Sequence, residues 1–346
     1  MNPMLRSTLI LALITGTIIT LTSSHWLFAW VGLEINTLAM VPLITQHPHP
    51  RATEAAMKYF LTQVTAATML LFASTINANL VGHWTITTQS SPLALTLLTA
   101  ALTMKLGLAP AHLWYLEALQ GTNMPTALIL ATWQKLAPLS VLLMTINQLP
   151  PNILLTLGFL SALVGGLGGL NQTQLRKIMA YSSIIHMGWL VTALALNKDI
   201  ATLTFTTYLT LTTPLFLTFI TTTTKTLPDL STAWLTTPTL LYTMMLSLLS
   251  LGGLPPLTGF LPKWLIIDGL ITIELLPLSA ALVMSSLPSL FFYLRMAYLT
   301  TLTTAPSTTT SKHKWHLPPS PTHLLPITLI LTLLLLPLAP LCPLTW

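Results

Sequence analysis

Four ionisable side chains stand inside stretches of the chain that are otherwise apolar: Glu34, Lys105, Lys135 and Lys263. A lysine at the centre of a bilayer costs about 2.5–3.5 kcal/mol on insertion scales, so its presence there indicates a partner or a function. Burial favours the neutral form of a lysine, whereas a nearby carboxylate favours the charged form, so a small movement of the carboxylate loads or releases a proton. These residue types predict proton transfer, with Glu34 and Lys105 as a switchable pair and Lys135 as the next carrier.

Lys135 has two simpler interpretations. Its ammonium can snorkel toward an interface, although the residue stands near the centre of the apolar stretch 124–146. It can also form a structural ion pair that has no part in transport. His112 and His186 are weaker candidates for the same relay, because histidine titrates near neutral pH. A hydrogen-bonded structural role is the alternative for each histidine.

The composition indicates what kind of protein must position these residues. The chain has 346 residues, of which 53% are hydrophobic and only 6% are charged, and its mean hydropathy is +0.77. Soluble proteins carry about 25% charged residues, so this chain cannot build a water-facing surface. It is expected to be an all-α polytopic membrane protein. The formal net charge of +6 comes from scattered basic residues and does not indicate a nucleic-acid partner.

Other kinds of site find no support in the sequence. The single cysteine, Cys342, cannot form an internal disulfide, a cysteine-based iron–sulfur site or a cysteine-rich zinc site. The glycine-rich stretch 165–170 lacks the spacing of a dinucleotide-binding loop, and close helix packing explains it better. There is no Walker motif and no HExxH motif. We therefore expect no cofactor and no metal on this chain.

A helix needs about 20 mainly apolar residues to cross a bilayer. Division of the chain at polar and Pro/Gly clusters predicts about eleven such spans. The first is expected to be a span rather than a signal peptide, because no small-residue cleavage pattern follows it. The ninth is too long for one straight helix and is expected to be broken. The predicted spans are residues 3–23, 25–45, 55–79, 92–113, 124–146, 151–170, 175–196, 200–221, 238–275, 277–300 and 322–345.

The basic residues near the span ends indicate an orientation. Nine of them fall on the side of the N-terminus, and one, Lys198, falls on the opposite side. The positive-inside rule therefore places the N-terminus inside, and an odd number of spans places the C-terminus outside. The nine residues are Arg6, Arg51, Lys58, Arg176, Lys177, Lys225, Arg295, Lys312 and Lys314.

Two of the apolar stretches are interrupted by a similar short motif. Gly-Leu-Ala-Pro occupies residues 107–110 and Gly-Leu-Pro-Pro occupies residues 253–256, with Lys105 and Lys263 close by. Paired interruptions of this kind are typical of transport sites built from discontinuous helices. Each interruption falls in the fourth span of a group of five, and a second group of five must run upside down. The prediction is one membrane domain, residues 1–346, made of two inverted five-helix repeats, residues 1–148 and 149–300, and a loop with a C-terminal helix, residues 301–346.

Five segments of the chain resemble one family of membrane proteins. They are similar to the antiporter-like subunits of mitochondrial NADH:ubiquinone oxidoreductase, respiratory complex I, in the shortened subunit 2 form of animals. The similarity covers essentially the whole chain, and the family is related to the large subunits of multisubunit cation/proton antiporters. The segments are WVGLEINTLAMVPL (30–43), TEAAMKYFLTQ (53–63), TWQKLAP (132–138), GLNQTQLRKIMAYSSIIHMGW (169–189) and LSLGGLPPLTGFLPKW (249–264).

The resemblance implies a fold and a role for each of the four relay residues. The fold is two inverted five-helix repeats with discontinuous fourth helices. Glu34 matches the acid of the family pattern, Lys105 its partner lysine, Lys135 the central lysine and Lys263 the lysine at the far end of the channel. Redox chemistry in other chains is expected to drive protons stepwise along these residues.

The resemblance also implies a setting. FMN, iron–sulfur clusters and ubiquinone are expected in other subunits, and the expected partners are core and accessory subunits of the membrane arm and phospholipid. The expected location is the mitochondrial inner membrane, with the N-terminus in the matrix and the C-terminus in the intermembrane space. The chain begins at the first repeat, as in the shortened animal form, whereas bacterial relatives carry three further N-terminal helices.

Two other functions remain open at this point. A stand-alone antiporter that exchanges Na⁺ or K⁺ for H⁺ fits an inverted repeat equally well, and cation-dependent transport by the isolated chain would favour it. A structural segment of a membrane arm is the second alternative, with the charges serving to lock the packing. A broken membrane helix leaves backbone groups that need water or protein partners. Hydrated cavities that reach both membrane faces from the buried lysines would count against the structural alternative, and their absence in every state would support it.

Overall fold

The structure is built almost entirely from helices. The computed structural model describes residues 2–88, 91–233, 238–302 and 324–334, and these ranges contain no strand beyond two isolated bridges. Seven helices in these ranges are long and apolar enough to cross a membrane, and so is the segment Met124–Thr145, which comprises α6, η1 and α7. The predicted class, an all-α polytopic membrane protein, is therefore confirmed.

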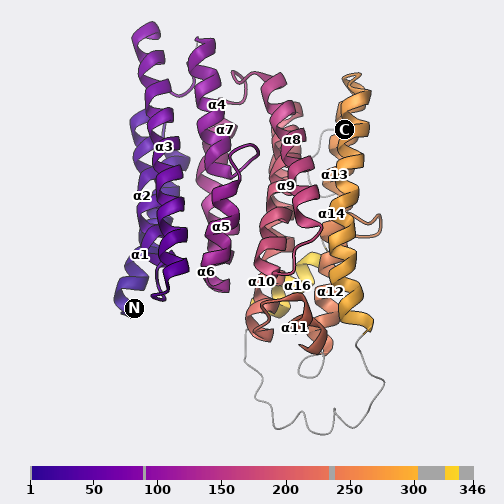
Figure 1. The fold of residues 1–346 in the computed structure, drawn as a ribbon. Helices are drawn as coiled ribbons and strands as arrows, with labels where there is room; N and C mark the ends of the chain where they lie inside the picture. Colours follow the sequence, from indigo (N-terminus) through magenta and orange to yellow (C-terminus); the bar gives the residue numbers. More distant parts are fainter. Residues whose placement is uncertain (1, 89–90, 234–237, 303–323, 335–346) are drawn as a thin grey trace. The chain divides into compact units, whose positions relative to one another are not determined.

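The chain divides into two compact units, Met1–Ser161 and Ala162–Trp346. In the first unit α1 packs on α2, and α3 packs on α2, α4 and α5, so the helices run side by side as in Figure 1, where this part is indigo to magenta. The helices of this part are α1 (Pro3–Thr22), α2 (Trp26–Ile44), α3 (Pro50–Val81), α4 (Pro92–Leu106), α5 (Leu113–Gly121), α6 (Met124–Ala131), the short 3-10 turn η1 (Trp133–Lys135), α7 (Leu136–Thr145) and α8 (Pro151–Gly169), whose end passes into the second unit.

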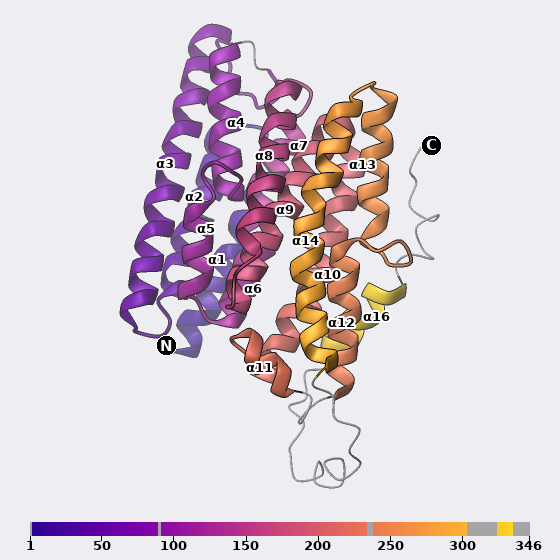
Figure 2. The ribbon, with the colours of Figure 1, turned by 45° about the vertical axis from the view of Figure 1, so that its right-hand side comes forward.

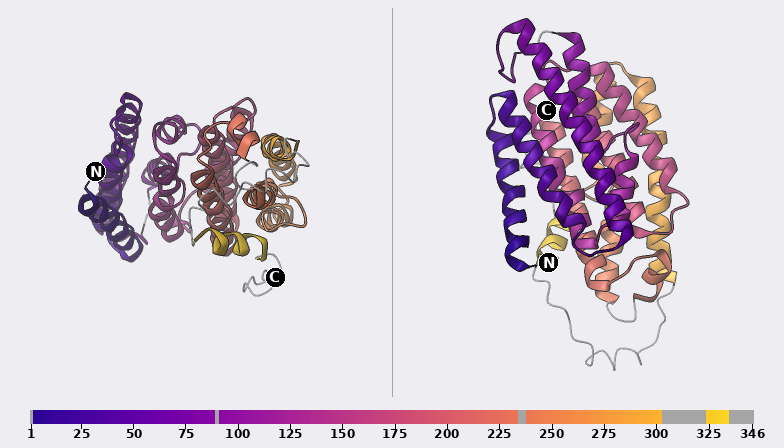
Figure 3. Two further views of the ribbon diagram at one scale, coloured as in Figure 1. Left: turned by 90° about the horizontal axis from the view of Figure 1, so that it is seen from below. Right: turned by 60° about the vertical axis from the view of Figure 1, so that its left-hand side comes forward.

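The second unit packs around one central helix. α10 contacts α9, α12, α13 and α16, and α14 covers α12 and α13, as Figure 2 shows in orange. Viewed from below in Figure 3, the helices within this unit project as neighbouring rings. The helices are α9 (Leu175–Leu196), α10 (Lys198–Thr222), α11 (Leu227–Thr232), α12 (Pro238–Gly252), α13 (Phe260–Thr272), α14 (Leu276–Leu302) and α16 (Leu324–Leu334).

Local sequence explains how the helices begin and how threonine fits into them. α4 starts at Pro92, whose missing N–H is not needed in a first turn, and the Ser91 hydroxyl accepts a hydrogen bond of 3.2 Å from Ala94 N. The threonine hydroxyls donate back to carbonyls of their own helix, as Thr192 does to Trp189 O at 2.8 Å. This internal bond satisfies the hydroxyl where no water reaches it.

Both interruptions predicted from the Gly-Leu-x-Pro motifs are confirmed. Residues 107–112 separate α4 from α5, and residues 253–259 separate α12 from α13. Gly107 and Gly253 follow the ends of α4 and α12 with φ angles of 77° and 82°. This left-handed conformation is easily adopted only by glycine and ends a helix, and the prolines that follow cannot resume it.

A third interruption lies in the fifth predicted span and is not evident from its apolar pattern. The tight turn η1 (Trp133–Lys135) separates α6 from α7. Pro138 lacks the N–H that would bond the carbonyl of Gln134, and its ring crowds that carbonyl, so the backbone tightens into a 3-10 turn. Lys135 therefore lies at a discontinuity rather than on a regular helix face.

The loops of the first unit are tied together at one end. The connection between α1 and α2 pairs with the connection between α3 and α4 around the bridge of His25 and Thr85. Trp26 N donates to Trp84 O at 3.1 Å, and Ile86 N donates to Ser24 O at 3.1 Å. The pairing fixes the connection that precedes α4, and α4 runs from there to the break at residues 107–112.

The second unit contains a pairing of the same kind. The connection between α8 and α9 pairs with the connection that follows α10, around the bridge of Gln174 and Thr226. Leu175 N donates to Lys225 O at 3.1 Å, and Leu227 N donates to Thr173 O at 3.0 Å. In each group of five predicted spans, the connection after the first span is thus paired with the connection after the third.

The last predicted span is described only in part. α16 (Leu324–Leu334) falls within the predicted span 322–345, and the remainder of that span lies outside the described residues. Lys312, Lys314 and Cys342 also lie outside them.

Candidate functional site

A small cavity inside the first unit is lined by two of the four predicted relay residues. Its volume is about 20 Å³, which is room for about one water molecule. α2, α3, α4, α5 and the segment from α6 to α7 all contribute to its wall. The polar residues of the wall include Asn36, Tyr59, Gln63, Lys105, Gln134 and Lys135.

Lys105 lies in the last turn of α4, immediately before the break. Its side chain is 5% exposed, and within the described residues its Nζ has no hydrogen-bond partner. The indole Nε1 of Trp114, on α5, donates to Met104 O at 3.1 Å, so α5 folds back over the turn that carries Lys105. The carbonyl end of α4 carries partial negative charge, which favours a cation at this position.

Lys135 is held inside the first unit by the interruption between α6 and α7. Its side chain is 3% exposed, and its Nζ lies 5.0 Å from the centre of the Tyr115 ring, within cation–π range. The side chain therefore does not extend toward an interface, and the snorkelling interpretation is not what the structure shows. Lys105 and Lys135 line one cavity although they come from different spans.

Glu34 lies in the middle of α2, beside the cavity wall formed by Leu33 and Asn36. Its charge acts electrostatically on Lys105 and on the phenol of Tyr59. Among the described side chains, however, no ion pair within 4.0 Å joins Glu34 to Lys105. The predicted pair is therefore not closed by an ion pair in this conformation.

Two amide side chains on the cavity wall were not singled out from the sequence. Asn36 on α2 and Gln134 in η1 have buried amide atoms with no hydrogen-bond partner in the described part of the chain. Buried polar groups are normally paired with protein or water, so these amides can hold a water molecule between the charged residues. Only their mid-span position beside Glu34 and Lys135 could have drawn attention to them.

Lys263 lies in the first turn of α13, immediately after the break between α12 and α13. Its Nζ donates to Gly252 O at 2.9 Å, at the carbonyl end of α12, and the side chain is 9% exposed. The centre of the Trp189 ring lies 6.0 Å from the same Nζ. A Cβ at Gly253 would lie 2.9 Å from the Nζ, so the glycine makes room for the ammonium as well as ending the helix.

The two histidine candidates lie outside the cavity of Lys105 and Lys135. His112 is partly exposed in the break between α4 and α5, with its Nδ1 3.1 Å from Pro110 O. His186 on α9 has its Nε2 3.4 Å from the hydroxyl of Tyr293, and its ring centre lies 5.6 Å from that of Tyr208.

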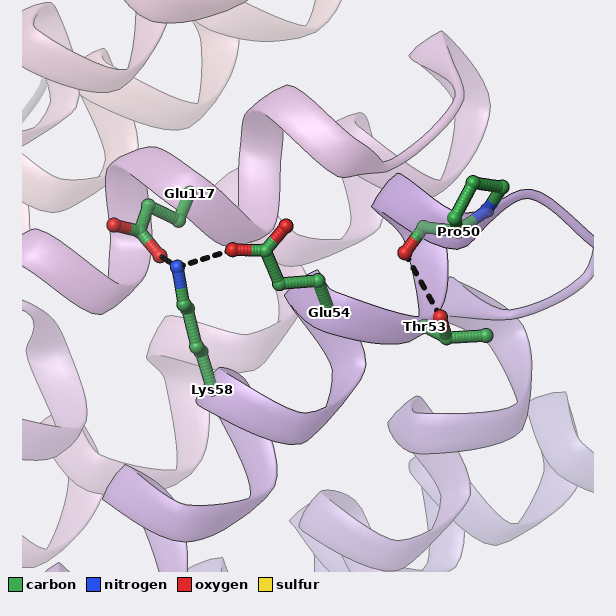
Figure 4. A network of polar contacts seen from close by, with 5 residues as sticks. All are labelled: Pro50, Thr53, Glu54, Lys58 and Glu117. Atoms are coloured by element: carbon green, nitrogen blue, oxygen red, sulfur yellow. Dashed lines mark hydrogen bonds and ion pairs between the residues drawn. The ribbon is translucent and has the colours of Figure 1, made fainter.

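The structure contains a charged cluster that the sequence reasoning missed. Lys58 on α3 contacts Glu54, one turn earlier on the same helix, at 2.6 Å and also contacts Glu117 on α5, as Figure 4 shows. Glu117 falls between two predicted spans in the sequence, and only the second half of the broken helix brings it to α3. A search of the described residues finds no group of three histidine, cysteine or acidic side chains able to hold a metal ion.

Comparisons with known sequences match this chain to NADH dehydrogenase subunits. Residues 23–288 match the family model described as NADH:quinone oxidoreductase/Mrp antiporter, transmembrane, and residues 290–342 match the model of the NADH dehydrogenase subunit 2 C-terminus. The chain is 52% identical over 344 residues to NADH-ubiquinone oxidoreductase chain 2 of Tetraodon nigroviridis, covering 98% of each sequence. It is 49% identical over 342 residues to the protein of that name from Xenopus laevis, covering 99% of each.

Solved structures are similar in fold. A chain of respiratory complex I from Thermus thermophilus matches with a TM-score of 0.84 and 27% identity, covering 98% of this chain and 80% of that chain. A chain of the Mrp complex from a Dietzia species matches with a TM-score of 0.71 and 18% identity, covering 83% of this chain and 59% of that chain. At that identity the second likeness concerns the fold alone.

Proposed function

This chain belongs to the NADH:quinone oxidoreductase/Mrp antiporter family of transmembrane proteins, and on that premise we propose that it is a proton-translocating subunit of the membrane arm of respiratory complex I. Its relatives, which match it over nearly their whole length, are named NADH-ubiquinone oxidoreductase chain 2. The chain acts as part of an NADH:ubiquinone reductase, and its partners are other subunits of that complex.

The observation that carries the proposal is the shared cavity of Lys105 and Lys135. Two buried lysine side chains from different spans line one small cavity, and Glu34 acts electrostatically on Lys105 from α2. A change of charge at one such site alters the proton affinity of the next, so protons can advance stepwise. In the proposed sequence Glu34 and Lys105 form the switchable pair, Lys135 is the next carrier and Lys263 stands at the far end of the path.

Electron transfer belongs to other subunits in this proposal. FMN, iron–sulfur clusters and ubiquinone are assigned to them, and this chain is assigned no cofactor and no metal. His112 and His186 remain secondary members of the relay. The chemistry of this chain is then limited to holding, orienting and passing protons.

The finer architecture is also part of the proposal. It comprises eleven membrane helices, with inverted repeats over residues 1–148 and 149–300 and a loop with a C-terminal helix over residues 301–346. The two loop pairings support it, because they recur at equivalent places in the two groups of five spans. The breaks between α4 and α5 and between α12 and α13 recur in the same way.

The proposed location is the mitochondrial inner membrane, with the N-terminus in the matrix and the C-terminus in the intermembrane space. The excess of basic residues on the N-terminal side supports this orientation. Accessory subunits of the arm and phospholipid are the further partners proposed.

The test is proton pumping by the assembled complex in vesicles. Lys105→Met and Lys135→Met are expected to lower the number of protons translocated per NADH oxidised, because each removes a titratable group and leaves a side chain of similar length. Lys198→Met is the matched control, since Lys198 is exposed at the start of α10. Full stoichiometry in both buried-lysine variants would reject the relay and favour a structural role, whereas Na⁺- or K⁺-dependent transport by the chain alone would favour an antiporter.

A further inference from the structure

The cluster of Lys58, Glu54 and Glu117 has no part in the relay described above, yet it joins a continuous helix to half of a broken one. Glu54 and Lys58 are on α3, whereas Glu117 is on α5, which is only nine residues long. The side chains of Glu54, Lys58 and Glu117 are 62%, 42% and 45% exposed. Ion pairs as open to solvent as these are weak, so Lys58 can exchange one carboxylate for the other.

α5 is separated from α4 by a break and packs against α3. The break at residues 107–112 removes the helical hydrogen bonds that would fix α5 to α4. At its other end, a Cβ at Gly121 would lie 2.8 Å from Arg51 O, so this end lies directly against the first turn of α3. Between these ends, Lys58 supplies the ionic tie from α3, at the turn that carries Glu117. The tie at Glu117 therefore contributes to where α5 lies on α3.

The residues that α5 carries reach both lysines of the cavity. Trp114 donates to Met104 O, beside Lys105, and the ring of Tyr115 lies under the ammonium of Lys135. Both residues lie within one turn of Glu117. A change at Glu117 is therefore transmitted to the two relay lysines through a rigid helical turn.

The charges around the cluster are balanced. The cavity beside it has a volume of about 180 Å³ and is lined by Arg51, Glu54, Lys58, Glu117 and Gln120. Arg51 and Lys58 supply two positive charges, and Glu54 and Glu117 supply two negative charges. No excess charge therefore favours one carboxylate over the other as the partner of Lys58.

We propose that Lys58 is a positioning residue for proton transfer: by bridging Glu54 and Glu117 it sets the position of the half-helix α5, and through Trp114 and Tyr115 it sets the surroundings of Lys105 and Lys135. This inference rests on the proposed function. It assigns to Glu117 the tie between the two helices and to Glu54 a pair within α3 alone.

Glu117→Gln and Glu54→Gln form a matched pair for the test. Each removes one negative charge from Lys58, but only Glu117→Gln removes the ionic tie between α3 and α5. In the assembled complex, Glu117→Gln is expected to remove at least half of the proton stoichiometry that Lys135→Met removes, whereas Glu54→Gln leaves the stoichiometry unchanged. Equal effects of the two variants, or none from Glu117→Gln, would overturn the proposal.

A charge exchange separates positioning from simple loss of folding. Lys58→Glu and Glu117→Lys alone are each expected to lower the stoichiometry per assembled complex, and the double variant is expected to recover it, since the tie between α3 and α5 is restored with reversed sign. Failure of the double variant to recover would contradict the positioning role. Full pumping by Lys105→Met and Lys135→Met would instead reject the proton relay itself, independently of Lys58.

Discussion

The Nζ of Lys263 donates a hydrogen bond of 2.9 Å to the carbonyl oxygen of Gly252, across the break between α12 and α13. A lysine at the start of α13 thus satisfies a carbonyl at the end of α12, which has no partner within its own helix. The cation also meets the negative end of that helix. The break and the charged residue therefore stabilise one another, and each is expected to fail without the other.

Substitution of Gly253 by alanine tests this dependence. A left-handed conformation costs a non-glycine residue about 1–2 kcal/mol, and the new Cβ would meet the Lys263 ammonium. Gly253→Ala is expected to destabilise the complex and to lower its proton stoichiometry. Gly252→Ala is the control, because a Cβ there would meet only Tyr293, at 3.9 Å. Equal thermal midpoints for the two variants would show that the conformation at residue 253 is unimportant.

The indole of Trp114 is expected to matter through its single donor. Trp114→Phe keeps an aromatic ring but loses the bond to Met104 O, a carbonyl beside Lys105 that also accepts a hydrogen bond of 3.1 Å from Gly107 N. The expected cost is about 1 kcal/mol, measured as a lower thermal midpoint of the purified complex. Trp264→Phe, at a ring 60% exposed, is expected to leave the midpoint unchanged. A Trp114→Phe variant as stable as the parent would contradict this role.

The packing of α1 on α2 depends on two glycines in contact. A Cβ on Gly32 would lie 2.8 Å from Gly16 O and 2.6 Å from Thr20 Cγ2. Small residues let membrane helices approach closely, and overpacking costs about 1–3 kcal/mol. Gly32→Ala is expected to reduce the yield of assembled complex, whereas Val31→Ala, on a partly exposed face, is not. Normal assembly of Gly32→Ala would show that the helices can separate without loss.

Asp229 provides a prediction about pH. Hydrogen bonds from the backbone N–H groups of Thr226 and Lys225, at 2.8 and 3.0 Å, hold the pKa of this carboxyl below its ordinary value. Because the folded pKa is the lower one, this stabilisation is complete above the ordinary aspartate pKa and is lost as the pH falls through the folded value.

Amide exchange at Thr226 measures this contribution. After correction for intrinsic rates, protection is expected to be constant between about pH 5 and 8, where the carboxyl stays ionised. Asp229→Asn is expected to raise exchange at Thr226 throughout that range, because the acceptor of the capping bonds is weakened. Asp199→Asn, in the first turn of α10, is the control. Unchanged exchange in Asp229→Asn would mean that the cap does not hold this loop.

Much of the helical framework could be predicted from composition and periodicity. The breaks at Gly107 and Gly253 could be predicted because a Gly-Pro interruption has a direct backbone cause. The 3-10 turn at Lys135 could not, since a proline inside an apolar stretch can also kink a helix without dividing it. The loop pairings were beyond reach as well, because hydrogen bonds between distant connections leave no periodic pattern.

The residues of the candidate site also divide into those that the sequence could identify and those that it could not. Lys105, Lys135 and Lys263 attract attention because a charge in an apolar stretch is costly, and all three are buried. Glu117 did not, because it stands in a polar connection by sequence and becomes significant only when α5 brings it to Lys58. The distance between Glu34 and Lys105 depends on side-chain geometry, and no spacing along the chain specifies it.

The two loop pairings bear on how the polypeptide is made. Residues 24–26 and 84–86 have both been synthesised before Lys105 is added, and residues 173–175 and 225–227 before Lys263. Chains fold from the N-terminus as they leave the ribosome. Each pairing therefore needs no residue of the broken helix that follows it, so the connections that orient Lys105 and Lys263 can form during translation without waiting for the later parts of the chain.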